Sequence, residues 1–350
     1  MSIEREKCLA AVLYGPEDMR IEDVDVPAIG PDDALIQMKA CTLCGSDLHG
    51  YHGNHPRVTY PRILGHEFSG LITRMGENVR GFEEGQRVVC DIDLRCGECE
   101  YCLKGRGNIC VDLKTQGFDA DGAYSEYVKV HKSNLYKLPD NVSFEDACFI
   151  QTLGIGYNGV KRRGEIKINE EVLIIGSGPI GLSALIIAKA SGANVISSDT
   201  VDYRLELAKE LGADETINSL NEDLVENVLS MTSGRGVEKV IEAVGGPQDI
   251  TLGQCTQAVK RGGLIVIIGT FSGNKATLRA TEFKDRELEM RGSRAYVGGE
   301  AFPDLIQLLS SRKIDVSKMI THRMNLAEVE KGLRMMDTKS ENVMKVVITP

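Results

Sequence analysis

Four cysteines share one short segment of the chain, and their spacing could hold a metal ion. The segment reads RCGECEYCLKGRGNIC, with the pattern C-x2-C-x2-C-x7-C at Cys96, Cys99, Cys102 and Cys110. Short C-x2-C spacings bring thiolates together in the tetrahedral arrangement that zinc requires. Four protein thiolates leave no open coordination position, so we expect a structural zinc lobe over about 93–112. A disulfide cluster is the alternative, which an oxidising compartment would favour.

A glycine-rich hexapeptide in the middle of the chain has the pattern of a dinucleotide-binding loop. Gly176-Ser177-Gly178-Pro179-Ile180-Gly181 follows the apolar sequence EVLII and opens an apolar helical stretch. The second glycine would let the backbone approach a pyrophosphate, which the free amides at the helix N-terminus could bind. A glycine turn of some other α/β protein is the alternative.

An acidic residue at the end of the next predicted strand and a basic residue after it bear on the choice between NAD and NADP. Asp199 ends that strand, where a carboxylate could accept hydrogen bonds from the adenosine ribose hydroxyls. The same carboxylate would repel a 2′-phosphate, so the sequence favours NAD over NADP. Arg204, five residues further on, could weaken this preference.

The elements that must position these residues change in character along the chain. Up to about residue 150, the sequence predicts short β segments that Gly, Pro and Asp separate. These segments lie at 34–40, 69–75, 87–91 and 124–129. Apolar strands at 171–176, 194–199, 237–244 and 263–269 then alternate with helices such as 179–191 and 203–211. This alternation predicts a parallel sheet with right-handed crossovers. The tail predicts a helix at 301–310 and a strand at 343–349.

Composition limits the class of protein. The chain has 350 residues, enough for two domains, and 42% hydrophobic and 26% charged residues, as in globular proteins. A net charge of −10 argues against nucleic acid and anionic membranes as partners. The N-terminal sequence has no apolar signal segment, so we expect a cytoplasmic protein with reduced thiols. Cysteines outside the metal motifs are expected to be small core residues, at Cys8, Cys41, Cys90, Cys148 and Cys255.

Several motifs together resemble one enzyme family. The segments CGSDLH, GHEFSG, the four-cysteine lobe, GSGPIG, SDTVDYRLELAKELGAD and KIDVSKMITHR are similar to those of the zinc-dependent medium-chain dehydrogenase/reductase family (the zinc alcohol dehydrogenase superfamily). The resemblance covers nearly the whole chain and is strongest to the sorbitol, threonine and glucose dehydrogenase branch. It implies an α/β fold in which a GroES-like β-barrel catalytic domain (1–152) is followed by an inserted Rossmann doubly wound parallel sheet (153–290). The chain would return to the catalytic domain over 291–350.

The resemblance also implies a catalytic zinc and a proton relay. Cys44, His66 and Glu67 correspond to the family's metal ligands or near-ligands, which leave an open position for a substrate oxygen. Ser46 and His49 correspond to its hydroxyl–ribose–imidazole relay, although His49 could equally be a surface histidine.

One position departs from the pattern of the branch. Sorbitol-type relatives have Glu-Pro, and threonine-type relatives Asp-Pro, where this chain has Gln151-Thr152; some glucose dehydrogenases use Gln. A neutral amide would remove one negative charge beside the metal and make it a stronger Lewis acid. Gln151 could bind the zinc itself, or a water could take that position instead.

The substrate is the least determined property. Gly269 and Arg294 follow late strands of the predicted sheet and are expected near the cofactor, although Arg294 could instead be a surface arginine. The polar loop 50–57, GYHGNHPR, could bind a hydroxylated substrate or simply be solvated. We therefore expect an NAD oxidoreductase with two zinc ions per chain that interconverts a secondary alcohol and a ketone, on a polyol, sugar or sugar-derived acid. A homodimer or homotetramer is expected. The alternatives are an L-threonine 3-dehydrogenase and a non-catalytic NAD-binding protein.

Overall fold

The chain folds into two compact units, each described here by itself. The structure is a computed structural model that describes residues 6–246, 249–270 and 276–350. Unit 1 comprises residues 1–151, 297–312 and 319–350, and unit 2 comprises 152–296 and 313–318. The division thus falls at 151/152, and the chain returns to unit 1 at Val297 rather than at residue 291.

Unit 1 is built mainly from antiparallel strands. Its described strands form sheets with the orders β2-β1-β4, β7-β8 and β10-β6-β5-β3-β18-β17, and β9 pairs with β3. The strands are β1 (Lys7–Gly15), β2 (Asp18–Asp25), β3 (Asp33–Thr42), β4 (Arg62–Ile63), β5 (Phe68–Met75), β6 (Arg87–Cys90), β7 (Asp93–Leu94), β8 (Lys114–Thr115), β9 (Tyr127–His131), β10 (Leu135–Lys137), β17 (Ile320–Asn325) and β18 (Lys345–Thr349). Because β18 pairs with both β3 and β17, two strands from the C-terminal segment join the same sheet as strands from the N-terminal segment.

Short helices connect the strands of unit 1. The α-helices are α1 (Gly45–Tyr51), α2 (Glu100–Leu103), α9 (Gly298–Ser310) and α10 (Val329–Thr338), and α3 (Phe144–Tyr157) continues into unit 2. The 3-10 helices are η1 (Gly107–Ile109), η2 (Lys132–Asn134), η6 (Leu326–Glu328) and η7 (Ser340–Asn342), while η5 (Ser317–Met319) crosses the division between the units. α3 packs its Cys148 with Ala40 of β3 and Val347 of β18 in a fully buried cluster.

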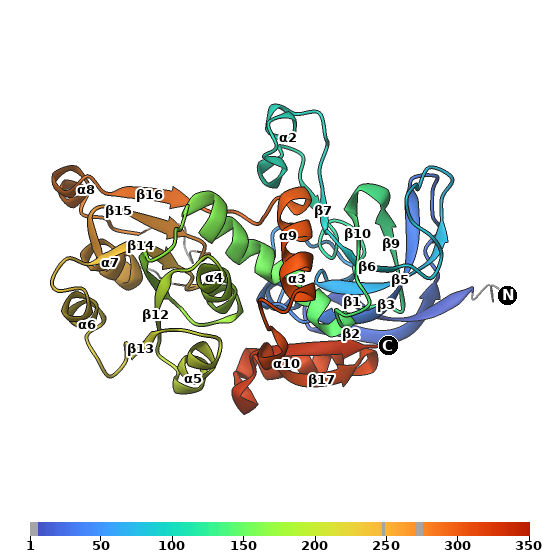
Figure 1. Cartoon of the computed structure of the whole chain (residues 1–350). Coiled ribbons are helices and arrows are strands. Elements are labelled where there is room, and N and C mark those ends of the chain that lie inside the picture. Colours follow the sequence, from blue (N-terminus) through green and yellow to red (C-terminus); the bar gives the residue numbers. More distant parts are fainter. Residues whose placement is uncertain (1–5, 247–248, 271–275) are drawn as a thin grey trace. The chain divides into compact units, whose positions relative to one another are not determined.

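Unit 2 is a six-stranded parallel sheet with helices between its strands (Figure 1). Its strand order is β13-β12-β11-β14-β15-β16, the doubly wound order that reverses next to the first strand. The elements are η3 (a π-helix, Asn158–Arg163), β11 (Glu171–Ile175), α4 (Pro179–Ala190), β12 (Asn194–Asp199), α5 (Asp202–Glu210), β13 (Glu215–Asn218), α6 (Leu224–Met231), β14 (Val237–Glu242), α7 (Asp249–Ala258), β15 (Val259–Ile267), α8 (Ala280–Arg286) and β16 (Glu289–Gly292). Nearly continuous apolar strands such as β11, with Leu173 and Ile174 fully buried, are typical of a sheet covered on both faces.

The predicted α/β fold with a doubly wound parallel sheet is confirmed. Boundaries differ where hydrogen bonding extends beyond the apolar run: β15 begins at Val259, four residues before the predicted start at residue 263. The strand predicted at 124–129 is β9, Tyr127–His131, whose residues are in register with β3, whereas Ser125 forms an isolated bridge with Ala10 of β1. The five cysteines predicted as core residues are all buried. Within the described ranges, no helix is long and apolar enough to cross a membrane.

Candidate active site and structural metal site

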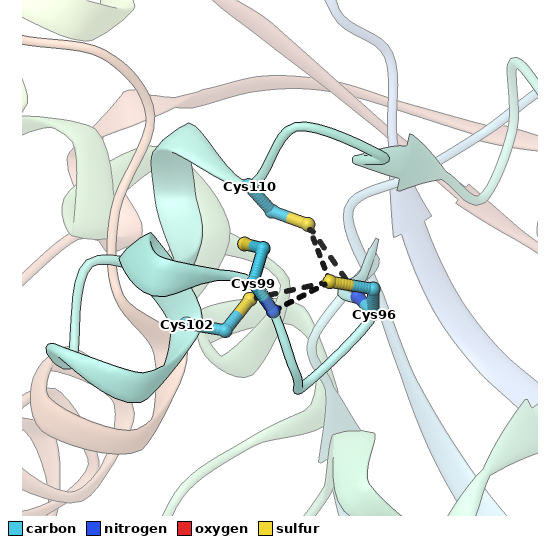
Figure 2. Close-up of side chains that lie close together, drawn as sticks. All are labelled: Cys96, Cys99, Cys102 and Cys110. Carbon is cyan, nitrogen blue, oxygen red and sulfur yellow. Dashed lines mark hydrogen bonds between the residues drawn. The ribbon is translucent and has the colours of Figure 1, made fainter.

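The four lobe cysteines converge on one point in unit 1 (Figure 2). Their Sγ atoms all lie within 4.8 Å of one another. The Sγ of Cys96 is 3.4 Å from that of Cys110 and 3.9 Å from that of Cys102. Zn–S bonds of about 2.3 Å in a tetrahedron place sulfur atoms about 3.8 Å apart, so these thiols fit zinc. All four are free cysteines, which argues against the disulfide alternative.

Two cations near this cluster have carboxylate partners of their own. Arg95 donates to Asp91 at 2.7 Å, and Lys104 pairs with Glu100 at 2.9 Å, so both are engaged elsewhere. Backbone N–H groups of Cys102 and Val111 lower the pKa of Cys99 to about 6, whereas burial raises the pKa of Cys102 to about 12. A divalent metal would stabilise all four groups as thiolates.

A second group of potential metal ligands lies elsewhere in unit 1. Cys44 is the residue that caps α1, and His66 and Glu67 immediately precede β5. One ligand atom from each of the three lies within 4.8 Å of the others. His66 and Glu67 are 2% and 1% exposed, so the group is largely shielded from water. A thiolate, an imidazole and a carboxylate are suitable zinc ligands, and three of them leave a position open.

Asp47 connects two of these residues, a contact that sequence reasoning missed. It is fully buried, and its Oδ1 lies 3.2 Å from Nδ1 of His66 while its Oδ2 accepts the backbone N–H of Cys44 at 3.0 Å. Burial alone would raise the pKa of Asp47, but His66 and the hydrogen bonds to the carboxylate lower it overall. Burial alone would lower the pKa of His66, but Asp47 and Cys44 raise it overall. The sequence contained one signal for this contact. Asp47 follows Cys44 by three positions, which is the spacing of a capping box at the start of a helix.

Glu67 has two buried partners that were also missed. Its Oε2 accepts hydrogen bonds from the hydroxyl of Thr42 and from the ammonium group of Lys345, which also donates to the carbonyl of Leu43 at 3.1 Å. Burial would lower the pKa of Lys345, but the charge of Glu67 raises it overall. A lysine inside the apolar strand sequence VMKVVIT was the available signal, because lysine is almost never fully buried without a partner.

The two predicted relay residues lie on α1. The Oγ of Ser46 is 3.2 Å from Sγ of Cys44 and 3.3 Å from Nε2 of His66, so this hydroxyl adjoins both ligands. His49 lies one turn further along α1 and is exposed to solvent. Ser46 therefore lies beside the potential metal ligands, and His49, one turn later, lies at the surface.

Gln151 is buried on α3, with 8% exposure. Its Oε1 has no hydrogen-bond partner among the described residues. An unsatisfied buried carbonyl oxygen costs about 1–3 kcal/mol, and a metal ion or a metal-bound water would offset this cost. The orphaned oxygen thus fits the predicted place of Gln151 beside a metal.

In unit 2, the glycine loop connects β11 to α4. Gly176 has φ of +99°, and a Cβ at Gly181 would lie 1.7 Å from the carbonyl oxygen of Gly176, so both positions require glycine. A Cβ at Gly178 would meet no atom within 4 Å. The loop is therefore tight on its inner side and open at Gly178, with Pro179 and Ile180 starting the helix, as a site for a pyrophosphate requires.

Asp199 ends β12 beside this loop, but its carboxylate is engaged by the backbone. Its Oδ2 accepts the N–H of Ser177 at 2.7 Å, and its Oδ1 accepts the N–H groups of Thr200 and Val201 at 2.8 and 3.1 Å. Arg204 lies 3.7 Å from Oδ2. Asp199 therefore holds the glycine loop in place, and the adjacent guanidinium group is a potential partner for a 2′-phosphate.

The remaining predicted residues are dispersed. Gly269 follows β15, and Arg294 is exposed in the segment after β16. Of the predicted polar loop 50–57, the first two residues end α1. In the remainder, His55 stacks on Phe118 with 4.2 Å between ring centroids, and Phe118 also contacts His66 at 4.8 Å. His52 instead lies 2.9 Å from Glu17. Only part of the polar loop therefore faces the ligand group of unit 1.

Comparisons with known proteins cover nearly the whole chain. A family model described as the alcohol dehydrogenase GroES-like domain matches residues 30–140, and one described as zinc-binding dehydrogenase matches residues 179–311. The chain is 34% identical to a sorbitol dehydrogenase of Bacillus subtilis over 97% of each chain. It is 36% identical to an L-threonine 3-dehydrogenase of Pyrococcus furiosus, over 91% of this chain and 92% of that one.

A solved structure agrees with these matches. A dehydrogenase structure from Sinorhizobium meliloti, bound to NADP, superimposes with a TM-score of 0.93 at 31% identity, covering 99% of this chain and 100% of that one. The predicted combination of a GroES-like domain with a doubly wound parallel sheet is confirmed.

Proposed function

Because the chain belongs to the zinc-type medium-chain dehydrogenase family, we propose that it is an NAD-dependent enzyme that interconverts a secondary alcohol and a ketone. The observation that carries the proposal is the convergence of Cys44, His66 and Glu67 around one point, with the Ser46 hydroxyl beside two of them. A chain that had lost catalysis would have no reason to keep this arrangement. The proposed substrate is a polyol, sugar or sugar-derived acid, because a sorbitol dehydrogenase is among the relatives that match over nearly full length.

We infer a place for each cofactor from these residues. Zinc at Cys44, His66 and Glu67 would supply a Lewis acid for the substrate oxygen, and the nicotinamide would supply the hydride acceptor. Cys96, Cys99, Cys102 and Cys110 would hold a second zinc with a closed coordination sphere. The glycine loop with Asp199 and Arg204 would bind the adenosine half of the dinucleotide, and Gly269 and Arg294 are proposed to lie near its other half.

The proton of the alcohol needs a path to water. The Ser46 hydroxyl adjoins the ligand group, and the His49 imidazole is exposed to solvent, with which it can exchange protons. We assign Ser46 to accept the proton of the alcohol at its Oγ as it gives up its own hydroxyl proton, and His49 to release a proton to water. A cytoplasmic location, supported by the free state of all ten cysteines, and a homodimer or homotetramer complete the proposal.

A substrate screen combined with metal analysis tests this function. The zinc-loaded chain is assayed with polyols, their phosphates, aldoses, sugar acids and L-threonine, with NAD⁺ and with NADP⁺, by the absorbance of the reduced nicotinamide. We expect two zinc ions per chain and the highest kcat/KM on an unphosphorylated polyol or sugar with NAD⁺. Preference for L-threonine would replace the proposed substrate class, and preference for NADP⁺ would overturn the assignment of Asp199.

His49→Gln isolates the relay within the same assay. The variant should keep both zinc ions but oxidise the alcohol more slowly, with the larger loss at low pH, where proton release is hardest. A pH–rate profile identical to that of the wild type would remove His49 from the relay.

A further inference from the structure

We propose that Tyr124 is a positioning residue that sets the affinity of the catalytic site for zinc by holding Asp47. The inference rests on the proposed function, because it takes Cys44 and His66 to be zinc ligands. Tyr124 lies between β8 and β9, far in sequence from both ligands, and is fully buried.

The hydroxyl of Tyr124 reaches the segment that carries Cys44. It donates to Oδ2 of Asp47 at 2.6 Å, the same oxygen that accepts the backbone N–H of Cys44 at 3.0 Å. The other oxygen of Asp47 lies 3.2 Å from Nδ1 of His66. One carboxylate thus connects both ligand residues, and its shortest hydrogen bond comes from Tyr124.

The ring and backbone of Tyr124 reach the segment that carries His66. Its N–H donates to the carbonyl of Leu64 at 3.0 Å. Gly65, the residue before His66, has φ of +91°, and a Cβ there would lie 2.6 Å from Cδ1 of the Tyr124 ring. The ring therefore lies directly against the turn that presents His66, while the hydroxyl holds the loop that presents Cys44.

This arrangement controls how the imidazole faces a metal. When Nδ1–H of His66 donates to Asp47, Nε2 is left as the acceptor, and Nε2 is the atom that lies beside Ser46. Groups that orient a metal-bound histidine typically change metal affinity 10- to 100-fold when removed. Without the Tyr124 hydroxyl, Oδ2 of Asp47 would keep only the Cys44 N–H among the hydrogen bonds described above, and the carboxylate could turn away from His66.

Tyr124→Phe tests this inference, because it removes the hydroxyl and keeps the ring against Gly65. Zinc affinity is measured by chelator competition on the full chain, and the catalytic zinc is identified as the one that Cys44→Ser loses. We expect about tenfold weaker binding at this site and unchanged binding at the cysteine lobe. Tyr51→Phe is the matched control, because that hydroxyl also donates to a carboxylate, Glu330, at 2.6 Å; it should leave zinc affinity unchanged.

A double-mutant cycle shows whether Tyr124 acts through Asp47. Tyr124→Phe should cost little further zinc affinity in a chain that already carries Asp47→Asn. Additive losses would overturn the proposal, and so would wild-type zinc affinity in Tyr124→Phe. If either of these results is obtained while the wild-type chain holds two zinc ions and oxidises a polyol, only this inference fails. If the wild-type chain binds no zinc at Cys44, the proposed function fails and this inference fails with it.

Discussion

Lys345 is an ammonium group with 1% exposure whose charge partner, Glu67, is equally buried. Removing one member of a buried pair leaves the other charge without compensation, at a cost of about 3–5 kcal/mol. We therefore expect Lys345→Met to lower the free energy of unfolding of the zinc-free chain by about this amount, measured by urea denaturation in the presence of a chelator.

Two further variants give this prediction its controls. Glu67→Gln combined with Lys345→Met should recover part of the lost stability, because no charge is then left alone. Lys132→Met breaks a pair with Asp32 in which both side chains are more than 40% exposed, and it should cost less than about 1 kcal/mol. Wild-type stability of Lys345→Met would mean that Glu67 is compensated by another group.

Gln151 is the residue at which the chain departs from the pattern of its branch. If its orphaned Oε1 lies beside the metal, Gln151→Glu adds a negative charge there. Zinc affinity should rise, the apparent pKa that governs alcohol oxidation should rise, and turnover near neutral pH should fall, because the metal withdraws less charge from the alcohol. The readouts are a pH–rate profile and chelator competition.

Gln307→Glu, at an exposed position of α9, is the matched charge control for this variant. It should leave the pH–rate profile and the zinc affinity unchanged. If Gln151→Glu behaves in the same way, Gln151 lies outside the influence of the metal.

At the scale of elements, two of the three glycines between β11 and the first turn of α4 have different roles. Gly181→Ala places a Cβ 1.7 Å from a backbone oxygen, so the turn must open, and both thermal stability and nucleotide binding should fall. Gly178→Ala meets no protein atom within 4 Å, so stability should stay at the wild-type level. The added methyl group should nevertheless weaken nucleotide binding about tenfold or more, because it occupies the space that the pyrophosphate needs. Fluorescence titration with reduced nucleotide measures both variants, and wild-type affinity of Gly178→Ala would place the pyrophosphate elsewhere.

The cysteine lobe lacks the packing that holds other elements in place. α2 has no buried residue, and Leu103 and Val111 are 75% and 74% exposed. We therefore expect Cys99→Ser to lose one of two zinc ions and to lower the thermal midpoint by several degrees. Cys44→Ser should abolish turnover but keep nucleotide binding and nearly the wild-type midpoint. Equal loss of stability with retained activity in both variants would refute this division between a structural and a catalytic metal.

At the scale of the whole molecule, unit 1 depends on a strand from the end of the chain. β18 pairs with β3 on one side and β17 on the other, and it supplies Lys345 to the ligand group. Deleting residues 343–350 should therefore abolish binding of the catalytic zinc and make unit 1 sensitive to protease. Unit 2 contains its own buried core and should still bind nucleotide. Removing Pro350 alone, beyond the end of β18, is the control, and zinc binding by the longer deletion would contradict the prediction.

Much of this protein's structure could be predicted from residues that lie close together in the sequence. The lobe, the glycine loop and the parallel sheet were predictable, because each depends on residues within a few turns of one another or on a repeated strand–helix pattern. The convergence of Cys44 with His66 and Glu67 followed only from resemblance, since 22 and 23 positions separate the first residue from the other two. No spacing rule joins residues so far apart.

Only the tertiary structure decided which groups surround the ligands. Lys345 reaches Glu67 across 278 positions because β18 inserts beside β3, and Tyr124 reaches Asp47 across 77 because its backbone pairs with the segment before His66. The engagement of Asp199 with the glycine loop likewise follows from the adjacency of β11 and β12. Such contacts depend on which strands pair with each other. A sequence predicts the strands more readily than it predicts which of them are neighbours.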